Sequence, residues 1–441
     1  MKLSVLGLGY IGLPTAAMLA DAGHDVVGYD VDAGRLNALR AREIEAEPEV
    51  CEIVSRALDG GRLKLVDALA PSDAFLICVP TPTRGHKPDL SYVETATLQV
   101  AQLLRAGDAV VLESTVPPGT VERVVAGAIR RSGLEPDQFC IAHCPERVIP
   151  GDIVRELRTN ARVIGGRKPG DAEHARKLYA SFVTGPIHTT NCTTAELVKV
   201  VENTFRDVNI AFANELALLC EELGVDVWET IRLANEHPRV SILSPGPGVG
   251  GHCIPVDPHF LSNANPFVTE LIQTARRINE RMPDIIVRRV ASHVALEPRE
   301  AIVTLLGAAY KPNVDDTRES PTERIDELLR DRGYSTRIFD PLARRFSRPL
   351  CQNLNDAVRG SDALVLITEH DVFRAMDTFA VSKLMRYPLL ICARPPYNMP
   401  AWRDAGFTTY VLGAHERDEL STLGGSQVTP NEEPLLASVK S

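Results

Sequence analysis

Short apolar runs and helical repeats alternate along the first 190 residues. Five runs that follow the first βαβ-like segment are strand-like: "AFLICVP", "AVVLEST", "FCIAHCP", "ARVIGG" and "PIHTT". Helical segments separate several of them, which favours parallel strands joined by crossover helices. The pattern therefore predicts an α/β fold with a doubly wound parallel sheet. In such a sheet, ligands bind at the carboxyl ends of the strands.

A single long helix is predicted to follow, from about residue 192. The segment "TTAELVKVVENTFRDVNIAFANELALLCEELG" contains no proline, and no glycine before Gly224, and its apolar residues recur at helical spacing. Thr193 or Thr194 is the expected N-cap, and Gly224 is expected to end the helix.

One face of this helix carries a polar stripe. Lys199, Asn203 and Arg206 stand at positions i, i+4 and i+7, so they share a face. Such a stripe is often only a solvated surface. Its flanks, Val198, Val201 and Phe205, are apolar, which instead indicates half-buried donors at a functional face. Spacing alone leaves both interpretations open.

A second α/β pattern begins near residue 291. Its strand-like runs are "EAIVTLLGAAY", "STRIFDP", "DALVLITEH", "PLLICAR" and "TTYVLG". We therefore predict two Rossmann-like doubly wound domains, residues 1–190 and 291–414, joined by the long helix and a helical middle domain, residues 191–290. The polar, aperiodic residues 415–441 are expected to form a disordered tail.

Composition excludes several classes of protein. The chain has 441 residues and a net charge of −10, which argues against a nucleic-acid partner. It has no apolar run of membrane-spanning length and no features of a signal peptide. Nine cysteines without CxxC spacing indicate neither a disulfide framework nor a metal site. We therefore expect a cytoplasmic protein that contacts no membrane and holds no metal.

The first turn of the chain has the pattern of a nucleotide-binding loop. In "KLSVLGLGYIGLPTAAMLADAGHDVVGYD", Gly7, Gly9 and Gly12 lie between a strand and a helix, and Asp30 ends the next strand. The glycines let a pyrophosphate approach the helix N-terminus, and the acid is placed to bind an adenosine ribose. This spacing predicts an NAD-binding domain, against the alternative of a plain βαβ unit. Two hydroxyls at strand ends either cap turns or contact the cofactor: Thr81 and Thr115.

A cysteine in "GPGVGGHCIPVDP", residues 246–258, is surrounded by glycines and prolines. Backbone amides there could stabilise an oxyanion beside the thiol of Cys253. Together with NAD, a thiol could capture an aldehyde as a thiohemiacetal, which loses a hydride to give a thioester and then an acid. A purely structural Cys253 remains open from the local sequence.

Taken together, the motifs resemble those of the UDP-sugar 6-dehydrogenases over about residues 1 to 412. The matching segments are "GLGYIG", "VPTPT", "STVPPGT", "CPERVIPG", "ELVKVVENTFRDVN", "GVGGHCIPVDP" and "YKPNVDDTRESP". The resemblance implies a homodimer that oxidises the C6 alcohol of a UDP-sugar to a carboxylate with two NAD. It also implies a place in polysaccharide biosynthesis.

The resemblance assigns expected roles to individual residues. Cys253 would be the nucleophile and Lys199 the cation that stabilises oxyanions, with Asn203, Asp257, Glu146 and Thr115 assisting. The expected NAD contacts are Gly7, Gly9, Tyr10, Ile11, Gly12, Asp30, Arg35, Thr81 and Thr115. The expected substrate contacts are Arg147, Val148, Lys199, Asn203, Arg206, His237, Arg239, Gly248, Tyr310, Lys311, Arg318 and Arg394, with His237 and Arg239 placed to reach a neighbouring subunit.

The identity of the sugar rests on two segments. "CPERV" and "LANEHPRVSILSPGPGVGGHC" are similar to the branch that oxidises UDP-N-acetyl-D-mannosamine, while UDP-N-acetylglucosamine and UDP-glucose remain alternatives. A non-catalytic NAD- and UDP-binding regulator has no reason to keep both Lys199 and Cys253. A two-electron hydroxyacid dehydrogenase would not need the thiol. Two segments depart from the family pattern: "CARPPYN", with Ala393 in place of an acid, and "EIEAEPEV".

Overall fold

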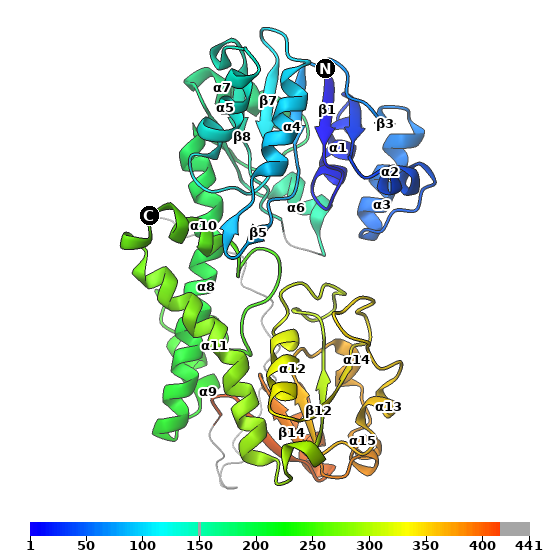
Figure 1. Ribbon diagram of the computed structural model, residues 1–441, viewed down its shortest axis with the longest axis vertical. Coiled ribbons are helices and arrows are strands. Elements are labelled where there is room, and N and C mark those ends of the chain that lie inside the picture. Colours follow the sequence, from blue (N-terminus) through cyan, green and yellow to red (C-terminus); the bar gives the residue numbers. More distant parts are fainter. Residues whose placement is uncertain (149–150, 415–441) are drawn as a thin grey trace.

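Two α/β units lie at opposite ends of the molecule and are connected by long helices. The computed structural model describes residues 1–148 and 151–414, so the tail predicted over 415–441 lies outside the described residues. Figure 1 shows the N-terminal unit above the C-terminal unit, with the helices α8 (Cys192–Leu223) and α11 (Glu270–His293) running along one side. The predicted α/β fold class is confirmed.

The N-terminal unit is built on an eight-stranded sheet with the order β10-β9-β8-β7-β4-β1-β2-β3. Its strands are β1 (Lys2–Leu6), β2 (Asp25–Tyr29), β3 (Leu63–Val66), β4 (Ala74–Ile77), β7 (Ala109–Leu112), β8 (Cys140–His143), β9 (Arg162–Gly166) and β10 (Ile187–Asn191). Its helices are α1 (Gly12–Asp21), α2 (Ala33–Arg40), α3 (Pro48–Asp59), α4 (Ser91–Ala101), a π-helical turn (Val121–Val125), α5 (Ala126–Arg131), α6 (Ile153–Thr159) and α7 (Pro169–Tyr179). A hairpin of β5 (Thr83–Arg84) and β6 (Lys87–Pro88) projects from it.

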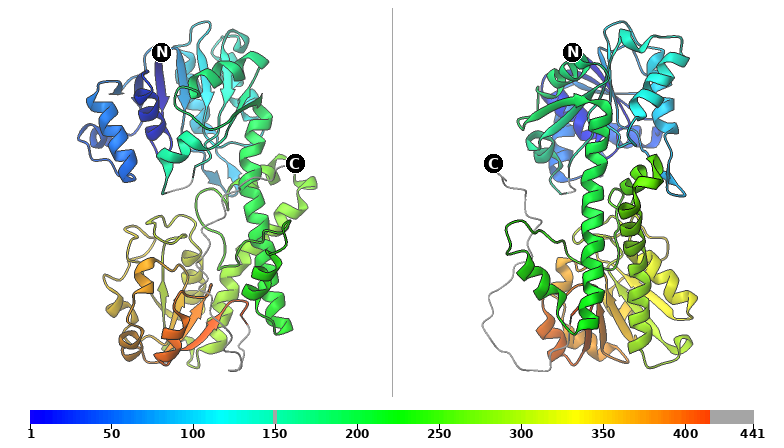
Figure 2. Two further views of the ribbon diagram at one scale, coloured as in Figure 1. Left: turned by 180° about the vertical axis from the view of Figure 1, so that it is seen from behind. Right: turned by 90° about the vertical axis from the view of Figure 1, so that its left-hand side faces the viewer.

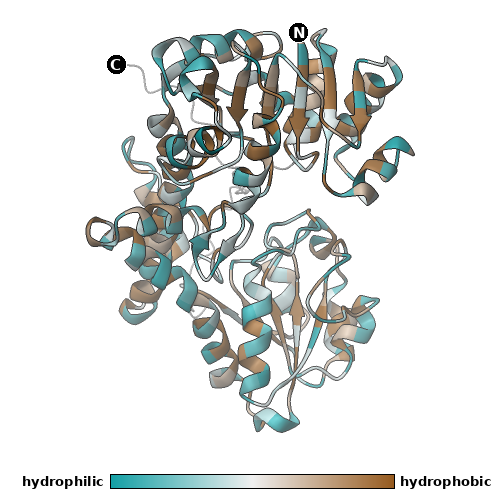
Figure 3. Cartoon of the chain, turned by 45° about the horizontal axis from the view of Figure 1, so that its top comes forward, coloured by the Kyte–Doolittle hydropathy of each residue, from teal (hydrophilic) through white to brown (hydrophobic). Residues whose placement is uncertain are grey.

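Each central strand is buried on both faces, as a parallel sheet covered by helices requires. In β7, Ala109 and Val111 belong to one apolar cluster, whereas Val110 and Leu112 belong to a second. Alternate residues of a strand point to opposite faces, so the two clusters lie on the two sides of the sheet. The continuous apolar runs in the sequence reflect this double burial (Figure 3).

One junction of the sheet departs from the parallel arrangement that we predicted. β8 and β9 pair antiparallel, through Ala142 with Gly166 and His143 with Gly165, while every other neighbouring pair in this sheet is parallel. The chain leaves β8 at the carboxyl edge and enters β9 from that same edge, so it needs no return crossover to the opposite edge. The segment after β8, which contains Glu146, therefore stays beside the edge where ligands bind.

The long central helix begins directly after β10, slightly earlier than its sequence suggests. Asn191, the last residue of β10, is the N-cap of α8, and its side-chain Oδ1 accepts from Thr194 N at 2.9 Å. The prediction of Thr193 or Thr194 as the cap was wrong, because strand and helix follow one another without a loop. Gly224 ends the helix in a left-handed conformation (φ 68°), as predicted. Figure 2 shows α8 running from the N-terminal unit along the full helical middle.

The remaining elements complete the middle and the C-terminal unit. The middle also contains α9 (Val227–Ala234) and α10 (Asp257–Ala264). The second sheet is parallel throughout, in the order β12-β11-β13-β14-β15. Its elements are β11 (Ile302–Leu306), α12 (Pro321–Asp331), β12 (Ser335–Phe339), α13 (Leu354–Val358), β13 (Ala363–Leu366), α14 (Asp371–Arg374), α15 (Thr378–Leu384), β14 (Leu389–Cys392), α16 (Met399–Asp404) and β15 (Thr408–Val411). Among the described residues, no helix is both long and apolar enough to span a bilayer.

Candidate active site

The glycine turn after β1 admits only glycine at two of its positions. A Cβ on Gly7 (φ +90°) would lie 2.6 Å from the carbonyl oxygen of Cys78, and one on Gly12 would lie 1.9 Å from that of Gly7. Gly9, by contrast, has open space around its Cα. The N-cap of α1, Ile11, offers no side-chain acceptor to the first amides of the helix. Leu13 N donates to the carbonyl of Gly9 at 3.2 Å and Pro14 has no amide proton, so the amide of Gly12 is the one that this end of α1 can offer to a pyrophosphate.

Asp30 lies beside this turn, at the end of β2. Its Oδ2 accepts from Leu8 N at 2.8 Å and its Oδ1 accepts from Asp32 N at 2.9 Å. Each carboxylate oxygen keeps a lone pair for a ribose hydroxyl. Arg35 donates to the carbonyl of Leu8 at 3.0 Å, which brings it to the same turn. The predicted nucleotide residues thus form one surface, and that surface fits a dinucleotide.

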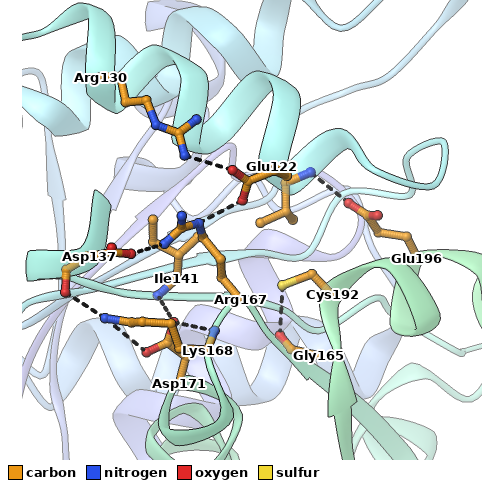
Figure 4. A network of polar contacts seen from close by, with 11 residues as sticks. Glu122, Arg130, Asp137, Ile141, Gly165, Arg167, Lys168, Asp171, Cys192 and Glu196 are labelled. Carbon is orange, nitrogen blue, oxygen red and sulfur yellow. Dashed lines mark hydrogen bonds and ion pairs between the residues drawn. The ribbon is translucent and has the colours of Figure 1, made fainter. Parts of the chain in front are cut away.

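Two threonines predicted to contact the cofactor lie together at the same edge. The hydroxyl of Thr81 donates to the carbonyl of Thr115 at 2.8 Å. The segment after Thr115 is held by Glu196 of α8, which accepts from the backbone amides of Gly119 and Val121. Figure 4 shows Glu196 at this end of α8. Burial raises the pKa of Glu196 to about 7 despite these donors. Sequence analysis did not identify Glu196, although an acid three residues before Lys199 was visible.

Tyr10 connects the glycine turn to the unusual "EIEAEPEV" segment. Its hydroxyl lies 3.5 Å from Oε1 of Glu47, which is the N-cap residue of α3. The Glu47 carboxylate also accepts from Gly151 N at 2.5 Å and Ile153 N at 3.1 Å. Burial first, and then the charges of Glu47 and Glu146, raise the pKa of Tyr10. The departure from the family pattern therefore supplies a carboxylate that anchors the entry to α6, a role that the sequence alone did not indicate.

A lysine and an acid form a buried ion pair next to this edge. Lys199 Nζ lies 3.0 Å from Glu146 Oε1, and the lysine side chain is 8% exposed. Burial disfavours the ammonium, but the charges of nearby acids, Glu146 first, outweigh it and raise the pKa of Lys199. Lys199 therefore remains charged inside the protein. The polar stripe of α8 is not a solvated face at this position.

Asn203 and Asp257 form a second buried contact beside the first. Asn203 Nδ2 donates to Asp257 Oδ2 at 2.6 Å, and the two residues are 8% and 3% exposed. Burial raises the pKa of Asp257 to about 7. Asp257 N donates to the carbonyl of Cys253 at 2.9 Å, so the cysteine occupies the turn that leads into α10.

The thiol of Cys253 is protonated in this environment. Burial, followed by the charge of Asp257, raises its pKa to about 12, although the ammonium of Lys199 acts in the opposite direction. A thiol adds to a carbonyl as its thiolate, so the proton must leave the sulfur of Cys253 as the carbon–sulfur bond forms. The glycine-rich setting thus does not produce a resting thiolate.

The glycine-rich loop is held by a chain of buried amides that the sequence did not reveal. Gly246 N donates to Asn214 Oδ1 at 2.8 Å, Asn214 donates to Asn279 Oδ1 at 2.9 Å, and Asn279 donates to Asp207 Oδ1 at 2.8 Å. Asp207 and Asn214 lie seven residues apart on α8, which places both on one face. The contact with Asn279 of α11 is decided by tertiary packing alone.

The C-terminal unit packs directly against the same loop. A Cβ on Gly250 would lie 2.6 Å from Cβ of Tyr310, and one on Gly251 (φ +90°) would lie 2.9 Å from its ring. Gly251 N donates to the carbonyl of Arg318 at 3.0 Å. These glycines are required so that the loop after β11 can approach Cys253. Three other predicted substrate residues lie nearby in the structure. The charge of Arg206 acts on Tyr310. Gly248 faces Asn279 and Pro321, and Arg394 faces Gly246.

The structure brings some predicted substrate residues to the cluster and leaves others apart. Val148 N donates to Glu146 Oε2 at 2.8 Å, and Arg147 pairs with Glu202 at 2.5 Å. Lys311 is exposed on the loop after β11. His237 and Arg239 lie on the exposed turn after α9, where Arg239 N donates to His237 Nδ1 at 3.3 Å. Within the described part of this chain, no contact joins these last two to the Lys199 cluster.

A glycine turn that fits a dinucleotide, with a buried ammonium and a half-buried thiol between it and a second α/β unit, is typical of a nicotinamide-dependent dehydrogenase. Three models of the UDP-glucose/GDP-mannose dehydrogenase family match the chain: the NAD binding domain over residues 1–183, the central domain over 193–281 and the UDP binding domain over 304–399. The chain belongs to this family, and its cofactor is NAD.

Curated relatives and solved structures agree with this membership. The UDP-N-acetyl-D-mannosamine dehydrogenase of Pyrococcus horikoshii is 46% identical over 402 residues, which cover 89% of this chain and 95% of that protein. A solved structure of that enzyme matches with a TM-score of 0.87 and 44% identity, covering 94% of this chain and 99% of its own. An NDP-N-acetyl-D-galactosaminuronic acid dehydrogenase of Ralstonia nicotianae is 43% identical, covering 85% and 92% of the two chains.

Proposed function

We propose that this enzyme oxidises the C6 alcohol of UDP-N-acetyl-D-mannosamine to the carboxylate, transferring four electrons to two NAD. The observation that carries the proposal is the buried arrangement of Lys199 with Glu146, and of Asn203 with Asp257, around the thiol of Cys253. Similarity to the Pyrococcus horikoshii enzyme over most of both chains supports the choice of sugar.

The overall reaction balances with one water and two NAD. The alcohol and water yield a carboxylate and three protons, and each NAD, when bound at the glycine turn, accepts one hydride. The first oxidation gives an aldehyde. Cys253 adds to that aldehyde to form a thiohemiacetal, and its thiol proton passes to the new oxygen. Loss of the second hydride and of that oxygen's proton leaves a thioester on Cys253, which water hydrolyses to release the acid and the thiol.

Lys199 supplies the fixed positive charge that these steps require. Negative charge develops on the C6 oxygen in both hydride transfers and during thioester hydrolysis. A buried ammonium stabilises such an oxygen more strongly than an exposed one, because water screens it less. Glu146 holds the ammonium in place and, with Thr115, provides an oxygen acceptor for protons that leave the C6 oxygen. Asp257, fixed by Asn203, orients the water that attacks the thioester.

The two α/β units would hold the two halves of the ternary complex. The remaining proposed NAD contacts, besides the glycine turn, are Tyr10, Ile11, Asp30, Arg35, Thr81 and Thr115. The proposed contacts to the UDP half are Tyr310, Lys311, Arg318 and Arg394, and those to the sugar are Arg147, Val148, Arg206 and the backbone of Gly248. All nine cysteines are unpaired in the structure, which suits a cytoplasmic enzyme.

We infer that the enzyme is a homodimer that assembles through α8. Large apolar side chains are exposed along one face of this helix: Leu197, Val201, Phe205, Phe212, Leu219 and Leu223, between 41% and 66% exposed. This face lies opposite the Lys199 stripe, so the prediction that Val201 and Phe205 flank that stripe was wrong. A monomer rarely exposes so long an apolar stripe. A dimer would also explain why His237 and Arg239 lie away from the cluster of their own chain, because they could reach the site of the partner.

The decisive test compares turnover of UDP-N-acetylmannosamine, UDP-N-acetylglucosamine, UDP-N-acetylgalactosamine and UDP-glucose. We expect two NADH per sugar without free aldehyde, and kcat/KM for the mannosamine substrate about ten- to hundredfold above UDP-glucose. The physical reason is that donors that bind the acetamido group would be left unpaired by glucose, at a cost of about 1–3 kcal/mol each. One NADH with accumulating aldehyde would contradict the four-electron chemistry. Equal rates would contradict the sugar assignment, and NAD binding without turnover of any sugar would indicate the regulator.

A further inference from the structure

A cluster of two histidines and a glutamate lies outside the catalytic residues. His86 is at the tip of the β5–β6 hairpin, His259 is on α10 and Glu280 is on α11. One ligand atom of each lies within 4.8 Å of the others. The imidazole centroids are 4.3 Å apart, and His259 Nε2 is 3.9 Å from Glu280 Oε1. Three separate elements, one of them in the N-terminal unit, thus bring metal-binding groups to one point.

We propose that His86, His259 and Glu280 bind one divalent transition-metal ion of the zinc class, which ties the β5–β6 hairpin to α10 and α11. Two imidazoles and a carboxylate are the ligands that zinc, cobalt and nickel accept, and water completes the coordination when the protein offers three. This site departs from our expectation of no metal, which rested on cysteine spacing. No spacing motif indicates this site, because no two of these ligands share an element.

The backbones of the two histidines are already fixed relative to each other. Asn263 Nδ2 donates to the carbonyl of His86 at 2.6 Å and to that of His259 at 2.7 Å. Around an ion with bonds of about 2.0–2.2 Å, neighbouring ligand atoms stand roughly 3.3 Å apart. The side chains therefore need only to rotate inward. His86 is exposed at the hairpin tip, so its ring has room to rotate toward the ion.

The nearest positive charge does not oppose the ion strongly. Arg276 lies 3.3 Å from Glu280 Oε1, but its other nitrogen pairs with the fully buried Asp207 at 2.6 Å. The charges of Arg276 and Asp207 cancel to a first approximation, which leaves the negative charge of Glu280 for the ion. Glu280 also keeps a second carboxylate oxygen.

The position of the site gives the ion a structural role. The hairpin begins two residues after Thr81 at the nucleotide edge, and α10 begins at Asp257, two residues before His259. β6 packs against α10, and Figure 1 shows the hairpin beside it. A bound ion would therefore fix the catalytic end of α10 relative to the NAD-binding unit.

Titration of the metal-free full chain with Co²⁺ tests the proposal, with visible absorption and equilibrium dialysis as readouts. We expect one Co²⁺ per chain, displaced by Zn²⁺, without the charge-transfer band of a thiolate ligand, and a higher Tm when Zn²⁺ is bound. His86→Ala and His259→Ala should each weaken Co²⁺ binding by more than about tenfold. NADH binding checks the fold of both variants, and the exposed position of His86 keeps that variant informative on its own.

Two matched variants separate this site from other metal-binding groups. His174→Ala removes an exposed histidine on α7 and should leave Co²⁺ affinity unchanged. Cys253→Ser should also bind one Co²⁺ normally. The proposal is overturned if the wild-type chain binds no stoichiometric Co²⁺, if His86→Ala binds it normally, or if binding disappears in Cys253→Ser.

Discussion

At the scale of residues, the central fact is a charged lysine that is almost fully buried. Lys199 is 6% exposed and stays protonated because the carboxylate of Glu146 lies 3.0 Å away. The thiol of Cys253 nearby is neutral, with a pKa raised to about 12 by burial and by Asp257. In the proposed mechanism, Lys199 would supply the positive charge that stabilises oxyanions, and Cys253 would lose its proton as it attacks the aldehyde.

Cys253→Ser and Lys199→Ala should fail at different steps. The serine variant should bind NAD and UDP-sugar but lose more than about a thousandfold in steady-state acid formation, because an alkoxide is a poorer leaving group than a thiolate. Lys199→Ala should slow both hydride transfers, by about 10²–10³ in kcat. Single-turnover NADH formation, with mass analysis of the quenched protein, distinguishes them. Normal turnover by Cys253→Ser would show that the thiol is structural.

At the scale of elements, α8 connects the cofactor edge to the catalytic cluster through one carboxylate. Glu196 lies three residues before Lys199 on this helix. Its carboxylate accepts from the backbone amide of Val121, where the π-helical turn begins. Its pKa rises from an ordinary value of 4.5 to about 7, so the folded chain holds a proton that the unfolded chain has lost. Stability from this group is therefore full below about pH 4.5 and is lost as the pH rises through 7.

Glu196→Gln should flatten the dependence of stability on pH. Between about pH 5 and 8, the wild-type free energy of unfolding should fall by about 1–3 kcal/mol more than that of the variant, which cannot ionise. Urea unfolding at several pH values measures this difference. Glu222, an acid on the same helix, provides the control: Glu222→Gln should keep the wild-type slope. Identical slopes for the wild type and Glu196→Gln would contradict the prediction.

Gly251→Ala should damage the loop that carries Cys253. The backbone there has φ +90°, and the new Cβ would lie 2.9 Å from the ring of Tyr310. Left-handed strain alone costs roughly 1–2 kcal/mol. Gly107→Ala is a close match, since Gly107 has φ +93° and open space around it. We expect Gly251→Ala to lose more stability than Gly107→Ala, and to bind UDP more weakly by calorimetry. Equal losses with unchanged UDP affinity would refute the role of this contact.

At the scale of the whole molecule, two α/β units close on a site that neither contains alone. Cys253 and Asp257 come from the helical middle, Glu146 from the N-terminal unit and Tyr310 from the C-terminal unit. The apolar face of α8 points away from this site, with Phe205 64% and Phe212 50% exposed. Burial of that stripe against a second copy would stabilise the same helix that carries Lys199.

Phe212→Glu should weaken the dimer, because a two-fold interface places the change in both copies. Light scattering after gel filtration should show a dimer for the wild type and a monomer for the variant. Phe379→Glu, at a 53% exposed position on α15, should remain dimeric. If His237 and Arg239 serve the partner's site, monomeric Phe212→Glu should also lose kcat/KM for the sugar while retaining NADH affinity. A wild-type monomer would contradict the assembly.

Local patterns in the sequence determined the elements and the chemistry of this protein. The predicted strands, the helix that ends at Gly224, the glycine turn with Asp30, and the stripe through Lys199 and Asn203 all appear in the structure. Each follows from residue types in a short stretch of sequence: continuous apolar runs, helical spacing, or the conformational freedom of glycine. A short segment of sequence is therefore enough to predict each of these features.

Only the tertiary structure decided which segments meet. The antiparallel junction of β8 and β9, the amide chain from Gly246 to Asn279, and the anchoring carboxylates Glu47 and Glu196 join residues that are distant along the chain. His86, His259 and Glu280 meet in the same way. No periodicity records these contacts, because they depend on how whole elements pack, and packing is settled by shape and burial over the entire molecule.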